Sequence, residues 1–461
     1  MKSSLDALLA EREASVSRRE GCSSQVLTSS PSALGGRKWA VKPSAGGGRG
    51  LFAIDDIQSG ELIFSDLPII TGPRTREGIV GCVVCGKINK PLANCSKNCR
   101  LPICSQECEK SPAHESDCNL LRCLTGGQNK STPDWSPFLY RSLALIRCLN
   151  MNDQDRRLVA MLHANRGKQV QRQVSELVAV AGGSFNNGDV RWLEHCCGVL
   201  DGTAFEIELT GTGTSLKGLF PLAAMMNHNC TPNTRSCCTT GTPSHSCDYR
   251  MLVIASRPIA KGAEILTSYC PLMWSNSLRR PYLAYSKHFI CNCQRCCDPT
   301  EFETYLQATK CQCGGIMLPL DSLNFNSEWS CCGCGKREGS RVITDNYASL
   351  NPDCGYISVQ LKTEHVFKST KNDSIKGLAD SDLAELLQNC TEVLQILDKL
   401  KLEKSTIKGK LCGRLEIIVQ EMKLRRMALE ESTILNYLKC GHIIREEDEE
   451  ARAIFCHLKP T

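Results

Sequence analysis

The chain has 461 residues, 31 of them cysteines, and a formal net charge of +6 at pH 7. This length allows two or three domains with a substantial core. No stretch approaches the roughly 20 apolar residues that cross a bilayer, and Lys and Arg are scattered along the chain, so composition gives no argument for a membrane protein or for direct nucleic-acid binding. We therefore expect a soluble intracellular protein.

The first 36 residues and the segment after them differ in character. Residues 1–36 are rich in Ser and poor in aromatic residues, which predicts a disordered tail. Two strands are expected next, Lys38 to Val41 and Glu61 to Phe64, with a glycine-rich segment between them at Gly46 to Gly50. Glycines let a backbone turn with positive φ and approach a ligand closely. This signal is weak by itself, and a hairpin without a ligand is at least as good an interpretation.

Eight Cys and His residues follow in close pairs between positions 82 and 118. Zn²⁺ prefers four thiolate or imidazole ligands in a tetrahedron, and a close pair supplies two of them from one turn. We expect two cross-braced zinc ions, one held by Cys82, Cys85, Cys104 and Cys108 and the other by Cys95, Cys99, His114 and Cys118. The segment is short, so the metal has to supply its folding free energy. A disulfide knot is the alternative, and we disfavour it because no apolar secretory signal opens the chain.

The middle of the chain changes from helical to strand-like patterns. Residues 135–200 repeat apolar side chains at helical spacing and predict a helical insertion. An apolar run from Phe220 then ends in the polar sequence Asn-His-Asn-Cys at 227–230, and two further strands are expected at Tyr249 to Ala255 and Glu264 to Tyr269. From about residue 375 the pattern is helical again.

Two more cysteine sets lie between these strands and the C-terminal helices. Cys291, Cys293 and Cys296 are one ligand short of a tetrahedral site, and Cys230 could complete it. The second set contains two close pairs, which is typical of a zinc ribbon, and consists of Cys311, Cys313, Cys331 and Cys334. Cys332 competes with Cys331 for the third position.

Five motifs in this order resemble the SET-and-MYND (SMYD) lysine methyltransferases. They are Gly-Arg-Gly-Leu at 48–51, the array at 82–118, Asn-His-x-Cys at 227–230, Glu-Ile-x-x-Ser-Tyr at 264–269 and Phe-x-Cys-x-Cys-x2-Cys at 289–296. The resemblance covers about residues 38 to 298, and the short C-terminal region resembles the arthropod SmydA-like branch. It implies an α+β fold in which a zinc-bound MYND finger splits a SET-domain β-fold, with a post-SET zinc segment, an α-helical insertion and a helical C-terminal region.

This resemblance also implies boundaries along the chain. The expected segments are a disordered tail (1–36), the first SET part (37–80), the MYND finger (81–119), the helical insertion (120–200), the second SET part (201–286), the post-SET segment with the ribbon (287–340) and the helical C-terminal region (341–461).

The resemblance implies that the cofactors are S-adenosylmethionine and zinc. Tyr269 is the expected catalytic residue, and the methyl donor is expected to contact Gly48, Arg49, Gly50, Thr203, Asn227, His228, Tyr269 and Phe289. Cys230 joins Cys291, Cys293 and Cys296 on a post-SET zinc, so we expect three zinc ions, or four with the ribbon. Methyl transfer to an amine is an in-line displacement, so the protein must mainly align the reactants and desolvate a neutral lysine. The implied partners are a histone or other protein lysine and Pro-containing peptides at the MYND finger, in the nucleus and cytoplasm and in transcriptional regulation.

Three residues or pairs depart from the family pattern. Lys287 stands where a channel aromatic is usual, Thr203 stands where an Asn is common, and Glu109 and Pro112 replace the usual Gln and Trp of the MYND tail. A cation in the channel could repel a lysine, so the alternative function is a catalytically weak or inactive adaptor that binds partners through its MYND finger. Because the Lys287 stem is long, we expect its ammonium to extend outward to solvent.

Overall fold

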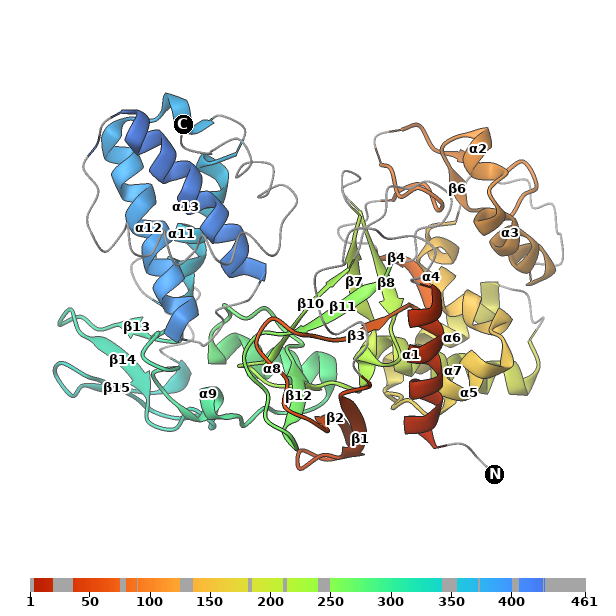
Figure 1. The fold of residues 1–461 in the computed structure, drawn as a ribbon, viewed down its shortest axis with the longest axis horizontal. Coiled ribbons are helices and arrows are strands. Elements are labelled where there is room, and N and C mark those ends of the chain that lie inside the picture. The colour runs from red at the N-terminus through yellow and green to blue at the C-terminus, as the bar shows by residue number, and fades with distance from the viewer. Residues whose placement is uncertain are drawn as a thin grey trace.

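Small, mainly antiparallel sheets form the centre of the molecule, and helices and cysteine-rich segments surround them (Figure 1). The computed structural model describes residues 4–19, 36–74, 80–88, 90–124, 136–180, 185–209, 214–238, 249–341, 355–371, 374–399, 406–425 and 427. The central strands are β1 (Trp39–Pro43), β2 (Arg49–Ala53), β3 (Leu62–Asp66), β4 (Ile70–Arg74), β7 (Phe205–Glu208), β8 (Ser215–Leu219), β9 (Asn227–His228), β10 (Thr234–Cys238), β11 (Met251–Ala255) and β12 (Glu264–Thr267).

The sheet order joins segments that are far apart in the sequence. One sheet has the order β1-β2-β12-β9, a second has β10-β11-β3 and a third has β4-β8-β7. In the first, β12 is antiparallel to β2 and parallel to β9, with Glu264 opposite Phe52 and Leu266 opposite Asn227. Because β12 lies between β2 and β9, Asn227 of β9 comes within hydrogen-bond distance of Arg49, at the end of the glycine-rich turn.

The N-terminal segment departs from the prediction of a disordered tail. Helix α1 (Leu5–Arg19) forms, and its Leu5, Leu8, Leu9 and Val16 are buried. These positions recur at helical spacing, so one face of the helix is apolar and packs on the main core. The tail prediction is wrong for α1 because composition averaged over 36 residues hid this short amphipathic stretch; the remaining residues, 20–35, lie outside the described ranges.

Five helices cover one end of the central sheets. They are α3 (Pro112–Leu124), α4 (Pro137–Arg147), α5 (Asp153–Ala160), α6 (Lys168–Val180) and α7 (Asn187–Thr203), with the short helix η3 (Cys148–Asn150) between α4 and α5. The α7 helix begins with a capping box between Asn186 and Asp189 and packs Leu193, Cys196 and Val199 into the core. The expected boundary at 200/201 falls inside α7, which runs on to the edge of β7.

A buried carboxylate supports the turn that leads to β9. Asp66 Oδ2 accepts hydrogen bonds from the backbone N–H groups of Leu222 (2.8 Å) and Ala223 (3.1 Å), at the start of the helix η4 (Ala223–Met225). Burial raises the pKa of Asp66 to about 6, and Arg12 opposes this rise. The apolar run thus ends in a fixed position, with Asn227 directly after it.

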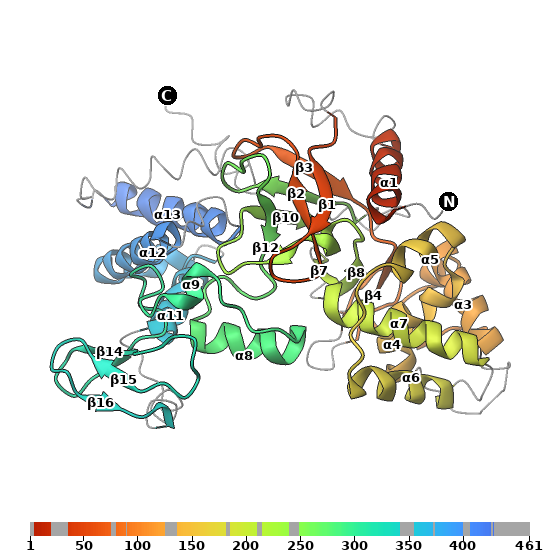
Figure 2. The same cartoon turned by 90° about the horizontal axis from the view of Figure 1, so that it is seen from below.

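The cysteine-rich segment at 81–119 contains β5 (Ala93–Asn94), β6 (Pro102–Ile103), α2 (Gln106–Glu109) and the start of α3. At the opposite end of the molecule in both views (Figures 1 and 2) lie the four strands of the ribbon and the C-terminal helices. They are β13 (Thr309–Lys310), β14 (Ile316–Pro319), β15 (Trp329–Cys331), β16 (Arg337–Glu338), α11 (Gly355–Ser369), η5 (Ser374–Gly377), α12 (Asp380–Lys399) and α13 (Thr406–Leu424).

The C-terminal helices have a hydrophobic core of their own. Leu383, Leu386 and Leu397 of α12 pack with Leu411 and Leu415 of α13, and all five are fully buried. Between this bundle and the sheets run α8 (Asn276–Lys287) and α9 (Gln294–Cys297), so the expected boundary at 286/287 falls within the last turn of α8. Among the described residues, no helix is both long and apolar enough to cross a membrane.

Candidate active site and zinc centres

The glycine-rich segment forms an open turn between β1 and β2. The Ser44 N–H donates to the Gly48 carbonyl (3.2 Å), and the Gly47 N–H donates to the Ser44 carbonyl (3.0 Å). Gly47 and Gly48 have φ angles of +96° and +69°, which favour glycine. Nothing lies within 4 Å of the point where a Cβ would stand on either residue. This face of the turn is therefore open to a ligand.

Asn227 and Glu264 lie directly against this turn. Asn227 Nδ2 donates to Glu264 Oε1 (2.7 Å) and to the Arg49 carbonyl (3.1 Å), and Ser44 Oγ donates to Glu264 Oε2 (3.1 Å). A Cβ on Gly50 would come within 2.2 Å of Glu264 Oε1 and 2.8 Å of Asn227 Nδ2, so a larger residue would displace these two side chains. Glu264 thus joins the two halves of the site, a role that its motif alone did not reveal.

His228, Tyr269 and Phe289 form an aromatic cluster beside Asn227. The His228 ring centroid lies 5.4 Å from that of Tyr269 and 5.7 Å from that of Phe289, and the Tyr269 and Phe289 rings meet edge to face. The Tyr269 N–H donates to His228 Nδ1 (2.9 Å), and the Tyr269 hydroxyl donates to the Met226 carbonyl (2.7 Å). The phenol oxygen therefore keeps lone pairs that can accept a hydrogen bond from a substrate.

The environment of Tyr269 keeps its phenol protonated. Burial raises the pKa of Tyr269 to about 12, and the nearby Glu264 carboxylate adds to this rise. At neutral pH the side chain is a neutral hydrogen-bonding group and not a phenolate base.

Lys287 lies over Tyr269 and does not extend freely into solvent as expected. Its Nζ donates to the Gly202 carbonyl (2.9 Å), lies 3.4 Å from the Asp201 carbonyl, and is 5.8 Å from the centre of the Tyr269 ring. Burial lowers the pKa of Lys287, and Asp201 opposes this effect. The C-terminal carbonyls of a helix carry partial negative charge, so the end of α7 compensates part of the ammonium charge.

The side chains of Thr203 and Arg49, which were also expected to contact the cofactor, make hydrogen bonds to other parts of the protein. The Thr203 hydroxyl donates to the Val199 carbonyl (2.7 Å) within α7, so its proton is not available to a ligand. The Arg49 guanidinium donates to the Met161 carbonyl, which leaves the Arg49 backbone, and not its side chain, facing Asn227. The cluster around the turn therefore consists of Gly48, Gly50, Asn227, His228, Tyr269 and Phe289, with Glu264 and Ser44 added.

Comparison with known proteins agrees with this geometry. A SET domain family model matches residues 48–270, from the glycine-rich turn to the residue after Tyr269. The chain is 29% identical over 417 residues to the SET domain-containing protein SmydA-8, isoform A, of Drosophila melanogaster, which covers 82% of this chain and 88% of that protein. The chain therefore contains a SET domain and is similar to a SmydA protein along most of its length, as the predicted resemblance to SMYD proteins requires. The predicted α+β fold is confirmed.

Two further relatives match a smaller share of the chain. The N-lysine methyltransferase SMYD2-B of Xenopus laevis is 27% identical over 276 residues, covering 56% of this chain and 62% of that protein. The histone-lysine N-methyltransferase ASHR1 of Arabidopsis thaliana is 27% identical over 295 residues, 59% of each chain. The similarity to SmydA-8 extends further along the chain than either of these.

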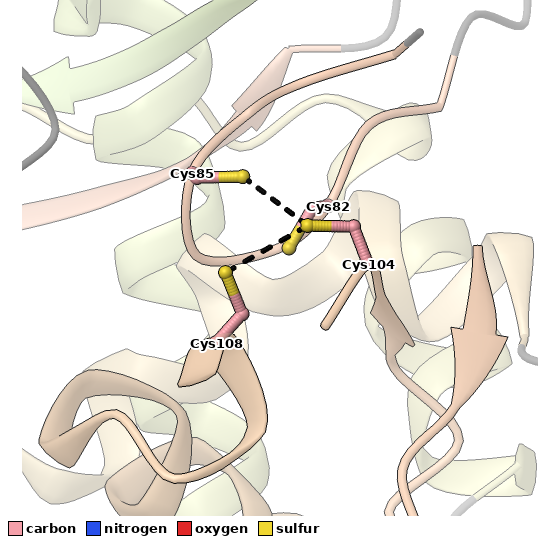
Figure 3. A group of neighbouring side chains, drawn as sticks. All are labelled: Cys82, Cys85, Cys104 and Cys108. Atoms are coloured by element: carbon pink, nitrogen blue, oxygen red, sulfur yellow. Dashed lines mark hydrogen bonds between the residues drawn. The ribbon is translucent and has the colours of Figure 1, made fainter. Parts of the chain in front are cut away.

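In the MYND segment, Cys82, Cys85, Cys104 and Cys108 lie together (Figure 3). The Cys104 sulfur lies 3.5 Å from that of Cys85 and 3.7 Å from that of Cys108, and Cys82 belongs to the same group. Zinc–sulfur bonds of about 2.3 Å in a tetrahedron place sulfurs about 3.8 Å apart. The donor set and its spacing therefore fit zinc.

The second MYND group contains Cys95, Cys99, His114 and Cys118. The Cys95 and Cys118 sulfurs are 3.8 Å apart, and Cys99 Sγ is 3.3 Å from His114 Nε2. His114 Nδ1 lies 2.6 Å from the Glu109 carbonyl, which can only accept, so Nδ1 carries the proton and Nε2 is left to bind the metal. The pairing is the cross-braced one predicted from spacing.

The two unusual residues of the MYND tail have local structural roles. The Glu109 carboxylate accepts a hydrogen bond from the Ser96 N–H, which holds the loop between the first two ligands of the second group. Pro112 is the first residue of α3, a position where the missing N–H costs nothing.

The post-SET group joins Cys230 to Cys291, Cys293 and Cys296 across more than 60 residues. The Cys230 sulfur lies 3.9 Å from that of Cys291 and 3.5 Å from that of Cys296. Hydrogen bonds from Cys291, Cys293 and Cys296 hold the pKa of the Cys230 thiol far below its usual range. The case for a metal site rests on the donor set, because four sulfurs that lie this close together fit one zinc ion.

The ribbon group contains Cys311, Cys313, Cys331 and Cys334. Sulfur distances are 3.7 Å between Cys311 and Cys334 and 3.5 Å between Cys313 and Cys331. Cys332, in the turn directly after β15, is exposed and is not a member of the group. Cys313 and Cys334 are exposed as well, so this group is more accessible than the post-SET group.

We expect four zinc ions per chain, because four complete donor sets are present. Elemental analysis after mild purification measures the total, and the double change Cys311→Ser and Cys334→Ser should remove one equivalent. On addition of a chelator the exposed ribbon zinc should leave before the buried post-SET zinc. A total of two or fewer in the unmodified protein contradicts this prediction.

Proposed function

We propose that this protein is an S-adenosylmethionine-dependent protein-lysine N-methyltransferase. The observation that carries the proposal is the contact between Asn227 and the Arg49 backbone, 178 residues apart in sequence, beside His228 and Tyr269. An open glycine turn, a neutral phenol and an aromatic wall meet at this point. S-adenosylmethionine bound there would supply an electrophilic methyl group on a sulfonium.

The residues of the chain provide binding, orientation and exclusion of water. The open face of the turn offers backbone groups at Gly48, and Asn227 Oδ1 accepts no hydrogen bond from any residue that the structure describes. The Tyr269 oxygen can accept an N–H from the substrate amine and so direct the nitrogen lone pair toward the methyl group. Burial of the amine favours its neutral, nucleophilic form.

The substrate class and setting belong to the same proposal. Relatives named as N-lysine and histone-lysine methyltransferases support a lysine on a histone or on another protein. We extend the proposal to a role in transcriptional regulation in the nucleus and cytoplasm, with Pro-containing peptides as ligands of the MYND finger.

One observation favours the adaptor as a second candidate function. The Lys287 ammonium lies 5.8 Å from the Tyr269 ring, where a second cation is repelled. The same field, however, lowers the pKa of an incoming lysine and so favours the neutral amine that reacts. The partial compensation by the end of α7 also weakens the repulsion, and for these two reasons we place the enzyme first.

Lys287→Tyr, which restores the usual aromatic residue, distinguishes the two functions. We expect the unmodified protein to bind S-adenosylmethionine by calorimetry and to transfer radiolabelled methyl groups to histones or to proteins of a cytosolic lysate. The variant should change this rate by less than about tenfold, since the charge that it removes is already partly compensated by the end of α7. Lys287→Met is the matched control, because it removes the charge and keeps the length of the side chain.

If the unmodified protein transfers no methyl groups and Lys287→Tyr transfers them rapidly, the natural chain is a poor catalyst. The adaptor function would then replace the enzyme. Failure of the parent to bind S-adenosylmethionine at all would exclude the proposed enzyme whatever the variant does.

A further inference from the structure

The Cys230 sulfur is approached by more than its three partner cysteines. Arg279 Nε donates to it at 3.2 Å, and His228 Nε2 lies 3.2 Å away. Cys230 is fully buried, and Arg279 Nη2 also lies 3.8 Å from the sulfur of Cys296. One thiolate thus connects the post-SET group, the helix α8 and the Asn-His motif.

Arg279 is a buried cation with a defined set of charged neighbours. Its Nη1 lies 2.6 Å from Glu301 Oε2, which Arg295 Nε also approaches at 3.0 Å, and all three side chains are fully buried. Two guanidinium groups against one carboxylate leave one positive charge in excess. An unpaired buried charge is very costly. Four thiolates around one Zn²⁺ form a dianion, so the post-SET zinc centre supplies the negative charge that this network lacks.

The other three cysteine groups differ in this respect. Within the described ranges, the hydrogen bonds to their sulfurs from outside each group come from neutral donors. These are backbone N–H groups, for example from Gly333 to Cys331 and from Lys97 to Cys95, and the Ser105 side chain at Cys108. No arginine donates to these sulfurs in the part of the chain that the structure describes. The charged contact is therefore particular to the centre that shares Cys230 with the active site.

One tautomer of the neutral His228 ring fits both of its hydrogen-bond partners, the Tyr269 N–H and the Cys230 sulfur. The Tyr269 N–H can only donate, so His228 Nδ1 accepts and is unprotonated. The proton of the neutral ring is then on Nε2, which faces the Cys230 sulfur. Hydrogen bonds run from Arg279 to Cys230, from His228 to Cys230 and from Tyr269 to His228.

We propose that Arg279 is a positioning residue that couples the post-SET zinc to the S-adenosylmethionine site through Cys230 and His228. The zinc half of this inference stands by itself, and the cofactor half rests on the proposed function. Coupling between two sites is reciprocal. Loss of the post-SET zinc therefore weakens cofactor binding, and bound cofactor slows release of that zinc.

The test uses the full chain with Arg279→Met and Arg279→Lys. We measure release of zinc to a chromogenic chelator and calorimetric binding of S-adenosylhomocysteine, neither of which needs methyl transfer. Substitution of a residue that hydrogen-bonds to a metal ligand typically lowers the metal affinity roughly 10- to 100-fold. Arg279→Met should release one zinc equivalent at least about tenfold faster and bind the cofactor product correspondingly more weakly, and Arg279→Lys should recover part of both because it keeps the charge.

Arg425→Met is the control, because Arg425 joins η5 and α12 through several hydrogen bonds and contacts none of the described sulfurs. It should release zinc like the unmodified protein. Zinc release from Arg279→Met at the unmodified rate overturns the proposal, and so does faster release with unchanged cofactor affinity. If Arg279→Met loses every zinc by unfolding, Arg279→Lys and Glu301→Gln decide in its place. If the unmodified chain binds no cofactor, the proposed function fails while the zinc-release measurement still tests Arg279.

Discussion

Replacing Asn227 and His228 together by alanine is expected to abolish S-adenosylmethionine binding. Asn227 joins the Arg49 backbone to Glu264, and His228 supports the Tyr269 backbone and packs against Phe289. Each lost hydrogen bond costs about 0.5–1.5 kcal/mol, and losing three of them with the ring contact weakens binding roughly 100-fold or more. Calorimetry with S-adenosylhomocysteine measures the loss.

The zinc content of this double variant is its internal control. The MYND groups share no ligand with Asn227 or His228, so both MYND zinc ions should stay in place. At most the post-SET zinc should become easier to remove, because His228 contacts Cys230. Simultaneous loss of the cofactor and of the MYND zinc ions would show that the two halves do not fold independently.

Tyr269→Phe is expected to lower the rate of methyl transfer about 100-fold or more while leaving cofactor binding nearly unchanged. The ring keeps its packing against His228 and Phe289. The oxygen that can orient the amine is lost, and misplacement of a reacting group by about 1 Å costs about 100-fold. Single-turnover assays at saturating cofactor separate the two effects.

Tyr282→Phe is a suitable control for this change. Tyr282 packs edge to face on Trp274 and belongs to the same cluster of side chains, but its hydroxyl is not part of the site. Because burial raises the pKa of Tyr269 to about 12, its phenol stays protonated well above pH 10, and activity should not fall with a Tyr269 ionisation near pH 10. A fall at that pH that disappears in Tyr269→Phe contradicts the assigned state.

Local spacing was sufficient to predict the metal groups. Close cysteine pairs lie on single turns, so the spacing of the ligands along the chain already predicts most of the geometry of a tetrahedral site. The choice between Cys331 and Cys332 was different, since the two are adjacent in sequence. The structure decided it, because β15 ends at the buried Cys331 and Cys332 lies exposed in the turn that follows.

The N-terminal helix shows how averaging can hide a structural signal. Leu5, Leu8 and Leu9 have helical spacing, but the Ser-rich residues that follow dominate the composition of the first 36 positions. Most residues of α1 are Leu, Ala, Glu or Arg, which favour helices, and packing on the main core stabilises the helix further. A pattern taken over a shorter window would have found it.

The sequence by itself determined the order of motifs, the resemblance to SMYD proteins, the α+β fold class and the four sets of zinc ligands, because each of these depends on residues close together or on a fixed order along the chain. The tertiary structure alone decided the partners of Glu264, Lys287 and Arg279. Glu264 meets Gly50 only because β12 pairs with β2, and Lys287 meets Gly202 only because the ends of α7 and α8 come together. Arg279 reaches Cys230 across 49 residues of sequence. Such contacts depend on how elements that are distant in sequence pack together, and the spacing of residues along the chain does not predict that packing.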